Sequence, residues 1–484
     1  MAKHKKRQHL PARTQPTLPA KPASVPAMSA AGRTRYELTA KLELLSPMHL
    51  GTGGFRVWPE LAKGDKNDFN SAPPEVAVIL RDHDDKPCLS GTSIKGLLRR
   101  IGELILAKDR CAVLFGEISN QDQGRMGAVL VRGAAQLQPA DATGMPYRAL
   151  LGEQLGDGVF IAARTRIDAA SGTAERNKLF FQEMVAAGAH FSLNLTIDIR
   201  PGALSAEEQE AILADLGRVL NRLGDAEGWA IGKGQAAGQG RIRLDRTTLT
   251  LRRGTIGATG ELAFIPFAFP RIDVARNAAP APSLLLHCPG PFLIADSSLR
   301  PEEKPAPGKA PVQISAQRAA SLALVLGPSV MGALRARAAW LAALDRHRQG
   351  HPPDETERDD RQAAVPTTPA ERLFGVTGFR GLIELRRLAV AGGRIQRFTS
   401  VRLDRFSGAP IDNALFTTEC FIDVRLQLTL DLTGRGKIEP TDLDRKLFDR
   451  LLSNLCAEGL RLGHGTNAGF GWFSVAREVA YAAE

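Results

Sequence analysis

The chain has 484 residues, 43% of them hydrophobic, and a formal net charge of +11 at pH 7. That length suits two or three domains with ordinary globular cores. The five cysteines are scattered and no CxxC pair occurs, which argues against a disulfide framework and a zinc site and favours a reducing, cytoplasmic compartment. No apolar run reaches the roughly 18 residues of a membrane span, so we expect no membrane partner.

The positive charge is concentrated at the N-terminus. Residues 1–35 hold eight Lys and Arg and no acidic residue, which leaves a net charge of +3 for all the others. This segment is rich in Pro and Ala and predicts a disordered basic arm. The arm is either a solvated tail or a flexible contact to RNA phosphate.

The first element after the arm is YELTAKLELL at 36–45, where apolar and polar residues alternate as in a half-buried strand. Pro47 ends it, and His49 follows with three nearby glycines that permit a tight turn. His49 is either a turn residue or an RNA contact. The next 20 residues are irregular and polar and include Asp65 and Asp68, which is typical of a functional or disordered loop.

A strand at 74–82 is followed by SGTSIKGLLRRIGELILA at 90–107, which predicts a helix. A helix N-terminus binds phosphate well because its first N–H groups are free. Lys95, Arg99 and Arg100 on the first turns strengthen that interpretation, although a capped surface helix with solvated cations is the alternative. The N-cap candidates are Ser90, Thr92 and Ser93, and the predicted apolar face consists of Ile94, Leu97, Leu98, Ile101, Leu104 and Ile105.

Further strands are predicted at 127–137, 190–199 and 241–253, with a helix at 205–224 that Ser205 caps. A turn-rich segment at 164–183 predicts a protruding hairpin. The order strand, helix, strand, strand, helix, strand is that of a ferredoxin-like α+β fold. A glycine loop of the form GxGxxxGxG precedes the last strand and contains Gly232, Lys233, Gly234, Gly238 and Gly240, and backbone N–H groups in such a loop are candidate contacts to RNA phosphate.

The second half of the chain repeats these patterns. R-Φ-D-x-x-S-G, six residues and L-F-x-x-E occur at 166–183 and again at 402–419, while LFG occurs at 114–116 and 373–375. The helix start LSGTSIKGLLR at 89–99 is echoed at 325–335, which contains Ser329 and Arg335. A second glycine loop contains Gly463, His464, Gly465, Gly469 and Gly471.

Agreement at so many fixed spacings indicates a tandem duplication. We therefore predict a first domain at 36–252, a linker at 253–282 and a second domain at 283–480. Within the second domain, the proline-bearing stretches 296–317 and 345–370 are expected to be surface insertions. Asp168 and Asp404 stand before turns and are interpreted as turn formers or ion-pair partners.

These motifs together resemble the RAMP superfamily of CRISPR-associated proteins. Within it, two units on one polypeptide are similar to the fused backbone subunits of type III effector complexes of the III-D and III-E branches. The resemblance implies two tandem ferredoxin-like, RRM-like domains that bind guide RNA and complementary target RNA beside other effector subunits. It also implies that the hairpins at 164–183 and 400–419 act as thumbs that unstack the duplex, with Arg164, Arg166, Arg402 and Arg405 contacting RNA.

The resemblance further implies cleavage of the target RNA by an aspartate in the loop after the first strand, with a transient divalent metal such as Mg²⁺ or Mn²⁺. Our candidates are Asp68 in the first repeat, with Asp65 as its neighbour, and Asp296 in the second. Two alternatives stay open: a structural RNA-coating subunit with degenerate sites, and a ribonuclease that trims guide precursors.

Overall fold

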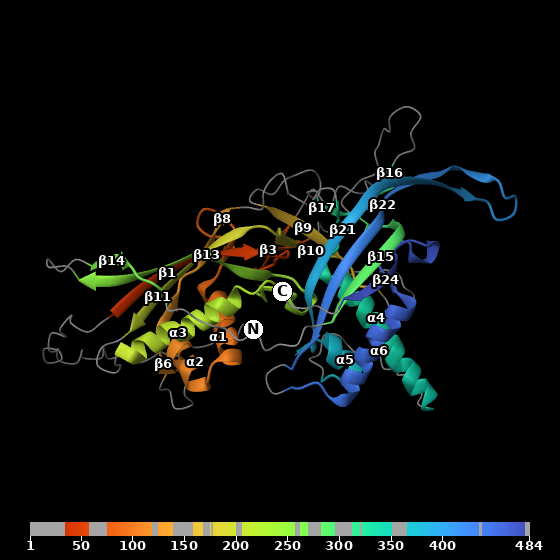
Figure 1. Cartoon of the computed structure of the whole chain (residues 1–484). Helices are drawn as coiled ribbons and strands as arrows, with labels where there is room; N and C mark the ends of the chain where they lie inside the picture. Colours follow the sequence, from red (N-terminus) through yellow and green to blue (C-terminus); the bar gives the residue numbers. More distant parts are fainter. Residues whose placement is uncertain are drawn as a thin grey trace, which may run out of the picture.

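The computed structural model forms two α+β units, each with more strand than helix, that lie side by side (Figure 1). The described residues do not include residues 1–33 of the predicted basic arm or the candidate residues Asp65, Asp68, Asp168 and Asp296. The structure describes residues 34–57, 75–118, 124–138, 158–167, 175, 178–199, 206–256, 262–269, 282–295, 312–319, 322–350, 365–434 and 438–479.

The first unit is built on a curled antiparallel sheet with the strand order β12-β13-β1-β11-β8-β4. β1 is central, because it pairs with β11 on one edge and β13 on the other. Its alternating pattern places Leu38, Leu42 and Leu44 in the core. The strands are β1 Thr34–Leu44, β4 Cys88–Leu89, β7 Val129–Val131, β8 Ala134–Gln138, β11 His190–Ile199, β12 Trp229–Ala230, β13 Arg241–Ile256 and β14 Leu262–Pro266.

Three helices cover one face of this sheet: α1 Gly91–Ile105, α2 Lys108–Phe115 and α3 Ala206–Leu223 (Figure 1). α1 begins where the Ser90 hydroxyl accepts a hydrogen bond from the Ser93 N–H at 3.1 Å, one of the three predicted caps. Its buried residues include Ile94, Leu97, Leu98 and Ile101. Leu104 was expected on this face but is 67% exposed, because it falls at the edge of the apolar stripe.

A smaller sheet holds the base of the first predicted hairpin. Its order is β2-β3-β10-β9, with β2 Gly51–Val57, β3 Glu75–Ile79, β9 Val159–Arg164 and β10 Phe180–Val185. β3 and β10 run parallel, with Val76 opposite Phe181, whereas β9 and β10 are antiparallel. The two strands that flank the predicted hairpin, β9 and β10, therefore lie next to one another at one edge of this sheet.

The second unit has the strand order β16-β22-β15-β24-β23, and β21 pairs along the length of β22. Its strands are β15 Ser283–Phe292, β16 Val312–Ile314, β21 Ile383–Leu403, β22 Pro410–Leu432, β23 Leu460–Arg461 and β24 Trp472–Val479, and its helices are α4 Gly327–Arg348, α5 Pro369–Phe374 and α6 Asp442–Glu458. The short pairs are β5 Glu117–Ile118 with β6 Gly124–Arg125, β17 Arg318–Ala319 with β18 Leu322–Ala323, and β19 Gly375–Val376 with β20 Phe379–Arg380.

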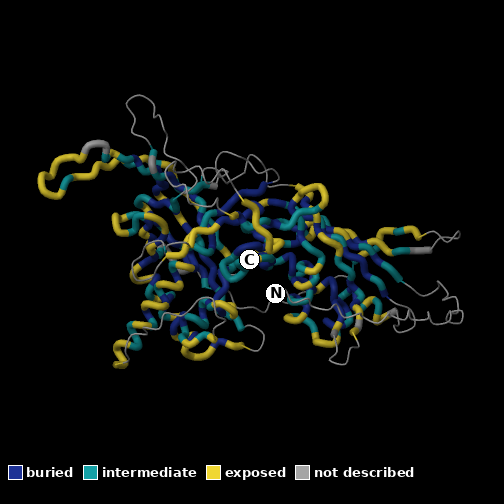
Figure 2. The backbone as a smooth tube through the Cα atoms, turned by 180° about the vertical axis from the view of Figure 1, so that it is seen from behind, coloured by how far each residue is buried: buried dark blue, intermediate teal, exposed yellow. Residues whose placement is uncertain are grey.

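β21 and β22 form a ribbon that extends far beyond the second sheet (Figure 1). They pair from Ile383 opposite Leu432 to Leu403 opposite Pro410. The outer part of the ribbon is largely exposed (Figure 2), and Phe406 at its tip is fully exposed. The hairpin predicted at 400–419 is thus the end of a much longer element.

The two units share one topology. The order β13-β1-β11-β7 in the first matches β24-β15-β22-β21 in the second. The pairing registers also correspond. Leu130 of β7 lies opposite Thr196 of β11, and at the matching position of the second unit Glu384 of β21 lies opposite Asp431 of β22. This register lets us match residues between the units without relying on sequence similarity.

Several sequence-based boundaries differ from the structure. The strand expected at 127–137 is two strands, β7 and β8, which pair with different parts of β11. The insertion expected at 296–317 ends in β16, which pairs with β22, so that part of the prediction was wrong. β14 lies within the expected linker and pairs with β13, and the ring of Phe267 lies 5.3 Å from that of Tyr36. The stretch expected at 345–370 begins within α4 and ends in α5.

The units meet at a seam with a small core of its own. Phe160, Ala162, Met184 and Ala186 from the hairpin base of the first unit pack with Leu326 of the second. This contact fixes the first hairpin base against the start of α4.

Among the described residues, no helix is long and apolar enough to cross a membrane.

Candidate nucleic-acid interface

One glycine loop precedes the last long strand of each unit. Each contains a short 3-10 turn, η4 at Gln235–Ala237 and η5 at Thr466–Ala468. All eight glycines of the two GxGxxxGxG motifs have positive φ, from 63° at Gly471 to 91° at Gly463. Side chains are disfavoured in that region, which explains why the motif needs glycine at these positions.

The loops use backbone N–H groups to hold the end of each unit's first strand. Lys233 N donates to His49 O at 2.9 Å, and His464 N donates to Leu293 O at 2.8 Å. Gly240 N and Gly471 N donate in the same way to the carbonyl oxygens of Pro47 and Pro291. These N–H groups therefore bind the chain itself, although the glycine pattern had suggested that they bind phosphate.

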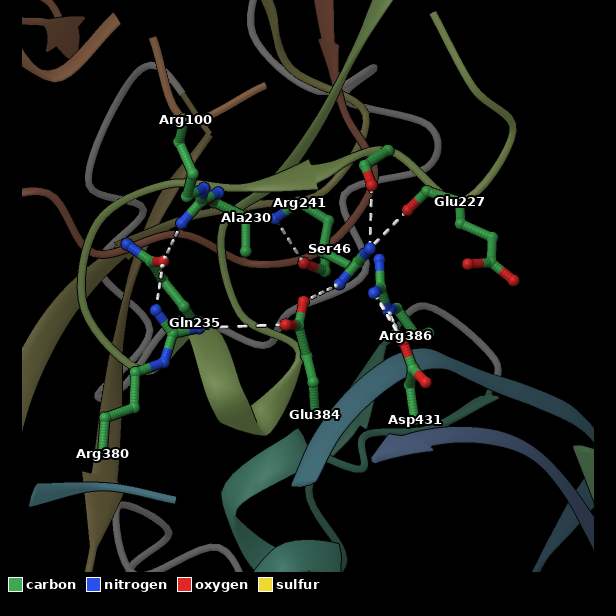
Figure 3. Close-up of polar contacts among 11 residues, drawn as sticks. Ser46, Arg100, Glu227, Ala230, Gln235, Arg241, Arg380, Glu384, Arg386 and Asp431 are labelled. Atoms are coloured by element: carbon green, nitrogen blue, oxygen red, sulfur yellow. Dashed lines mark hydrogen bonds and ion pairs between the residues drawn. The ribbon is translucent and has the colours of Figure 1, made fainter. Parts of the chain in front are cut away.

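The first glycine loop lies in the seam (Figure 3). The side-chain oxygen of Gln235 accepts hydrogen bonds from Arg100 at 2.8 Å and from Arg380 of the second unit at 3.0 Å. Arg100 also donates to the Ala230 carbonyl at 2.7 Å. Arg100, a predicted RNA contact, is therefore engaged within the protein.

His49 lies under this loop and is only 4% exposed. Its Nδ1 lies 2.8 Å from the carbonyl oxygen of Glu183 in β10. Burial lowers the pKa of His49, with the charges of Lys233 and Arg164 acting in the same direction. The turn interpretation fits this placement, because the imidazole joins the first strand to the hairpin base.

The last residue of the repeated hairpin motif is a buried glutamate in both units. The Glu183 carboxylate accepts hydrogen bonds from Arg56 at 2.7 Å and from the Ile79 N–H at 3.2 Å, and Arg81 lies 3.8 Å away. Sequence reasoning noted the repeat of this residue but assigned it no role.

Glu419 makes the matching cluster in the second unit. It accepts hydrogen bonds from Ser315 at 2.8 Å and Arg397 at 3.2 Å, and it contacts Arg318. Burial alone would raise the pKa of Glu419, but the Ser315 hydrogen bond and the two arginines outweigh it and lower the pKa. Each cluster joins the hairpin base to the strand that lies beside it, β3 or β16.

Basic side chains from both units approach one another beside the seam. Burial lowers the pKa of Arg164 to about 10, and its Nε is buried without a hydrogen-bond partner. Desolvation and the charge of Arg166 both lower the pKa of Arg335 on α4. Arg166 also pairs with Glu175 at 3.0 Å. This gathering of cations is a local positive patch of the kind that a polyanion neutralises.

The other predicted RNA contacts lie at the starts of α1 and α4, and most of them contact groups of the protein itself. Ser93 donates its N–H to the Ser90 cap, Arg99 contacts Glu103 at 3.4 Å and the Gly116 carbonyl, and Lys95 is half-buried on the same turns. In the second unit, Ser329 N donates to the Leu326 carbonyl at 3.0 Å. None of these contacts joins a residue of a helix start to an arginine of β21.

The β21 strand of the ribbon carries only positive charges over residues 385–403. Residues 385–403 contain five arginines and no acidic residue. Four of them are exposed along β21, namely Arg387, Arg394, Arg397 and Arg402, and Arg405 is exposed at the turn. Sequence reasoning had singled out only Arg402 and Arg405.

Asp404 shapes the tip of the ribbon. Its Oδ1 accepts hydrogen bonds from the N–H groups of Phe406 and Ser407 and from the Ser407 hydroxyl, at 2.7 to 3.0 Å. The Ser407 N–H and hydroxyl are the main causes of its lowered pKa. The turn-former interpretation is confirmed for Asp404, while Asp168 lies outside the described residues.

The catalytic candidates also lie outside the described residues, but their attachment points do not. The segment with Asp65 and Asp68 joins β2 to β3, and Asp296 follows Ala295, which bridges to Ala316. The described residues contain one group with metal-ligand spacing, Asp82, His83 and Asp84. This group was not predicted, and the Asp82 carboxylate is already engaged by the N–H groups of Asp84 and Lys86.

Comparison with protein families is consistent with the duplication. The model of the RAMP superfamily matches the chain twice, over residues 41–243 and 286–474. No curated protein sequence matches the chain significantly.

Proposed function

Because the chain belongs to the RAMP superfamily and contains two of its units, we propose that it is a backbone subunit of a type III CRISPR effector complex. In this role it binds the guide RNA and the guide–target duplex, next to other subunits of the complex. The matched strand orders of the two units agree with tandem ferredoxin-like domains.

The observation that carries this proposal is the arginine-lined ribbon. β21 presents exposed arginines, and residues 385–403 contain no acidic residue; apart from Arg397, which pairs with Glu419 of β22, these side chains suit contact with a phosphate backbone. Arginine also stacks on bases, so the ribbon can contact an unstacked nucleotide. We propose that this ribbon and the hairpin at 164–183 are the thumbs of the two units, with Phe406 at the tip of the second.

We further propose that the chain cleaves the target RNA through Asp68 and Asp296 with Mg²⁺ or Mn²⁺. The support is positional: both segments depart from the sheets beside a buried glutamate cluster. Arg56 and Ile79, on the strands that flank the first segment, contact Glu183, and Ser315, next to the Ala295–Ala316 bridge, contacts Glu419. A bound metal would supply charge neutralisation at the scissile phosphate.

RNA binding is tested with the purified full chain and a labelled guide-length RNA at several salt concentrations. The variant R394E/R402E should weaken binding at least about tenfold and lower the salt slope by roughly two, one per lost phosphate contact. The matched variant R445E/K446E makes the same charge change on exposed positions of α6 and should change affinity less than about twofold. Equal losses in both variants would show that only bulk charge matters.

A further inference from the structure

The first unit carries a hairpin that has no counterpart in the described part of the second. The outer end of β13, residues 252–256, pairs with β14 over 262–266, whereas the described β24 pairs with β15 and β23 alone. We call these two segments the edge hairpin. It lies outside both stretches that match the RAMP family, at the end of the first unit that faces away from the second (Figure 1). The edge hairpin is therefore a feature of this chain and not of the repeated unit.

The hydrogen-bonding pattern of the edge hairpin leaves one edge of β14 open. β14 runs antiparallel to β13, with Leu262 opposite Ile256, and just beyond it the Phe267 N–H donates to the Leu251 carbonyl at 2.9 Å. Hydrogen-bonded and non-hydrogen-bonded pairs alternate along an antiparallel ladder, so Leu262 and Phe264 belong to non-hydrogen-bonded pairs. Their N–H and C=O groups therefore point away from β13, to an edge on which the described residues place no strand.

The side chains of β14 make this open edge apolar. The strand reads LAFIP, and Leu262 and Ile265 are each 49% exposed. Natural proteins commonly protect an exposed strand edge with lysine or another charged residue, but β14 contains none, and Pro266 blocks only its last position. An apolar strand with free backbone groups along one edge is a template for the addition of another strand.

Arginines flank the open edge on both faces of the sheet. Arg252 donates to the outward carbonyl of Phe264 at 3.0 Å, and its guanidinium lies 5.6 Å from the centre of that ring. Arg253, on the other face, lies opposite Ile265, and both arginines are exposed. Glu37 lies opposite Arg252 on β1, on the side away from β14, and the described residues of the edge hairpin include no acidic residue. Two copies paired through β14 would bring these arginines together, so charge favours an acidic partner over self-pairing.

We propose that the free edge of β14 binds an extended, acidic segment of a partner protein, which joins the first sheet as an additional strand. Main-chain hydrogen bonds to Leu262 and Phe264 supply the affinity, and side chains supply the selectivity. The segment places apolar residues over Leu262 and Ile265 and acidic residues near Arg252 and Arg253. A nucleic acid would meet the arginines but would leave the apolar side chains and the backbone edge uncovered. The proposal does not depend on the RNA-binding function.

The test begins with selection from a displayed library of random peptides, each roughly ten residues long, on the RNA-free full chain. Selected sequences should combine Asp and Glu with strand-forming residues such as Val, Ile and Tyr. Hydrogen exchange at the N–H groups of Leu262 and Phe264 should slow when such a peptide binds.

A proline variant tests the backbone edge. Leu262→Pro removes one outward N–H and one exposed apolar side chain but no hydrogen bond to β13, a position at which an edge strand tolerates proline. It should weaken binding of the selected peptides at least about tenfold, measured by fluorescence anisotropy. Leu443→Pro is the matched control, because Leu443 is 64% exposed in the first turn of α6, where proline is also tolerated. It should change the affinity less than about twofold.

Charge reversal tests the chemistry of the partner and stays decisive if Leu262→Pro unfolds the edge hairpin. R252E/R253E should lose the acidic peptides by at least about tenfold and should select basic sequences from the same library. R445E/K446E makes the same reversal on α6 and should keep the acidic peptides within about twofold. The proposal is overturned if no selected peptide depends on β14, if the wild type selects basic sequences, or if the control variants lose equal affinity. It is also wrong if R252E/R253E weakens binding of labelled RNA while no acidic peptide binds the wild type.

Discussion

Glu183 and Glu419 occupy the same place in the two repeats, and each is buried against two arginines. In the first unit, the Glu183 carboxylate accepts a hydrogen bond from Ile79 of β3 and so joins the hairpin base to that strand. In the second unit, the Glu419 carboxylate accepts one from Ser315, next to β16. A carboxylate buried in this way is stable only while its partners stay in place. The motif thus ends in a glutamate that fixes the base of the hairpin.

Glu419→Gln should lower the free energy of unfolding by about 1–3 kcal/mol, because a charge-assisted set of hydrogen bonds is replaced by a neutral amide that cannot accept at both atoms. Urea denaturation measures this change. Asp423→Asn removes an exposed pair with His287 and should change the free energy of unfolding much less, because solvent screens that pair. Equal effects of the two variants would contradict a special role for the buried cluster.

The same cluster predicts a pH dependence. The pKa of Glu419 is lowered in the folded chain, so its stabilisation is fully present above the unfolded value of about 4.3. It is lost as the pH falls through the lower folded pKa, where the folded carboxylate takes up its proton. Thermal unfolding between about pH 3 and pH 6 should therefore show a steeper acid loss for the wild type than for Glu419→Gln. Parallel curves would exclude the linkage.

Arg241 of the first unit donates a hydrogen bond to Glu384 of the second at 3.0 Å, and this buried ion pair at the seam predicts strong coupling between the two residues. Arg241→Met or Glu384→Met alone should destabilise the chain by about 3–5 kcal/mol, because the remaining buried charge loses its nearest partner. The double variant should recover a substantial part of the loss. The cycle is measured by thermal or urea unfolding, with the half-exposed pair Arg243 and Glu43 as reference, where coupling should stay near about 1 kcal/mol or below. Additive losses at the seam would exclude the coupling.

The thumb proposal predicts separable effects on binding and on cleavage positions. Deleting 405–414 should spare guide RNA binding but abolish or displace one cut in a complementary target, because the unstacked position is lost. Deleting 169–178 should do the same for a second cut. Gel analysis of end-labelled target RNA reports both, and an unchanged pattern in the two deletions would refute the role.

The catalytic proposal predicts one cut per aspartate. Asp68→Ala and Asp296→Ala should each remove a different cut with Mg²⁺ or Mn²⁺ present, while target binding persists. A loss of roughly a hundredfold or more in rate is expected for a group that holds a metal or orients the attack. If Asp65→Ala erases the first cut instead, the assignment moves to Asp65. If all three variants cleave normally, the chain is a structural RNA-coating subunit.

The elements predicted best from sequence are those whose pattern is local. β1 and β11 follow strict alternation, and α1 and α3 follow a helical period. β16 was missed because three residues carry no readable pattern, and its pairing with β22 depends on residues about a hundred positions away. The full ribbon was missed for the same reason, since only its turn has a sequence signature.

The candidate site was likewise predictable from the sequence only in part. The repeat pointed to Glu183 and Glu419, but their partners lie in segments without a repeated motif, so the clusters could not be predicted. The glycine loops were found from their spacing, yet only the structure shows that Lys233 and His464 donate to the preceding strand. A glycine pattern predicts the backbone conformation but not which acceptor the N–H groups will meet.

The seam differs from a contact between separate molecules in the affinity that it needs. Arg241 and Glu384 belong to one polypeptide, so each meets the other at an effective concentration in the range of about millimolar. A buried ion pair of small net worth is sufficient under that tether, and dilution cannot separate the two sides. Fusing two units therefore relaxes the chemistry that the interface between them needs.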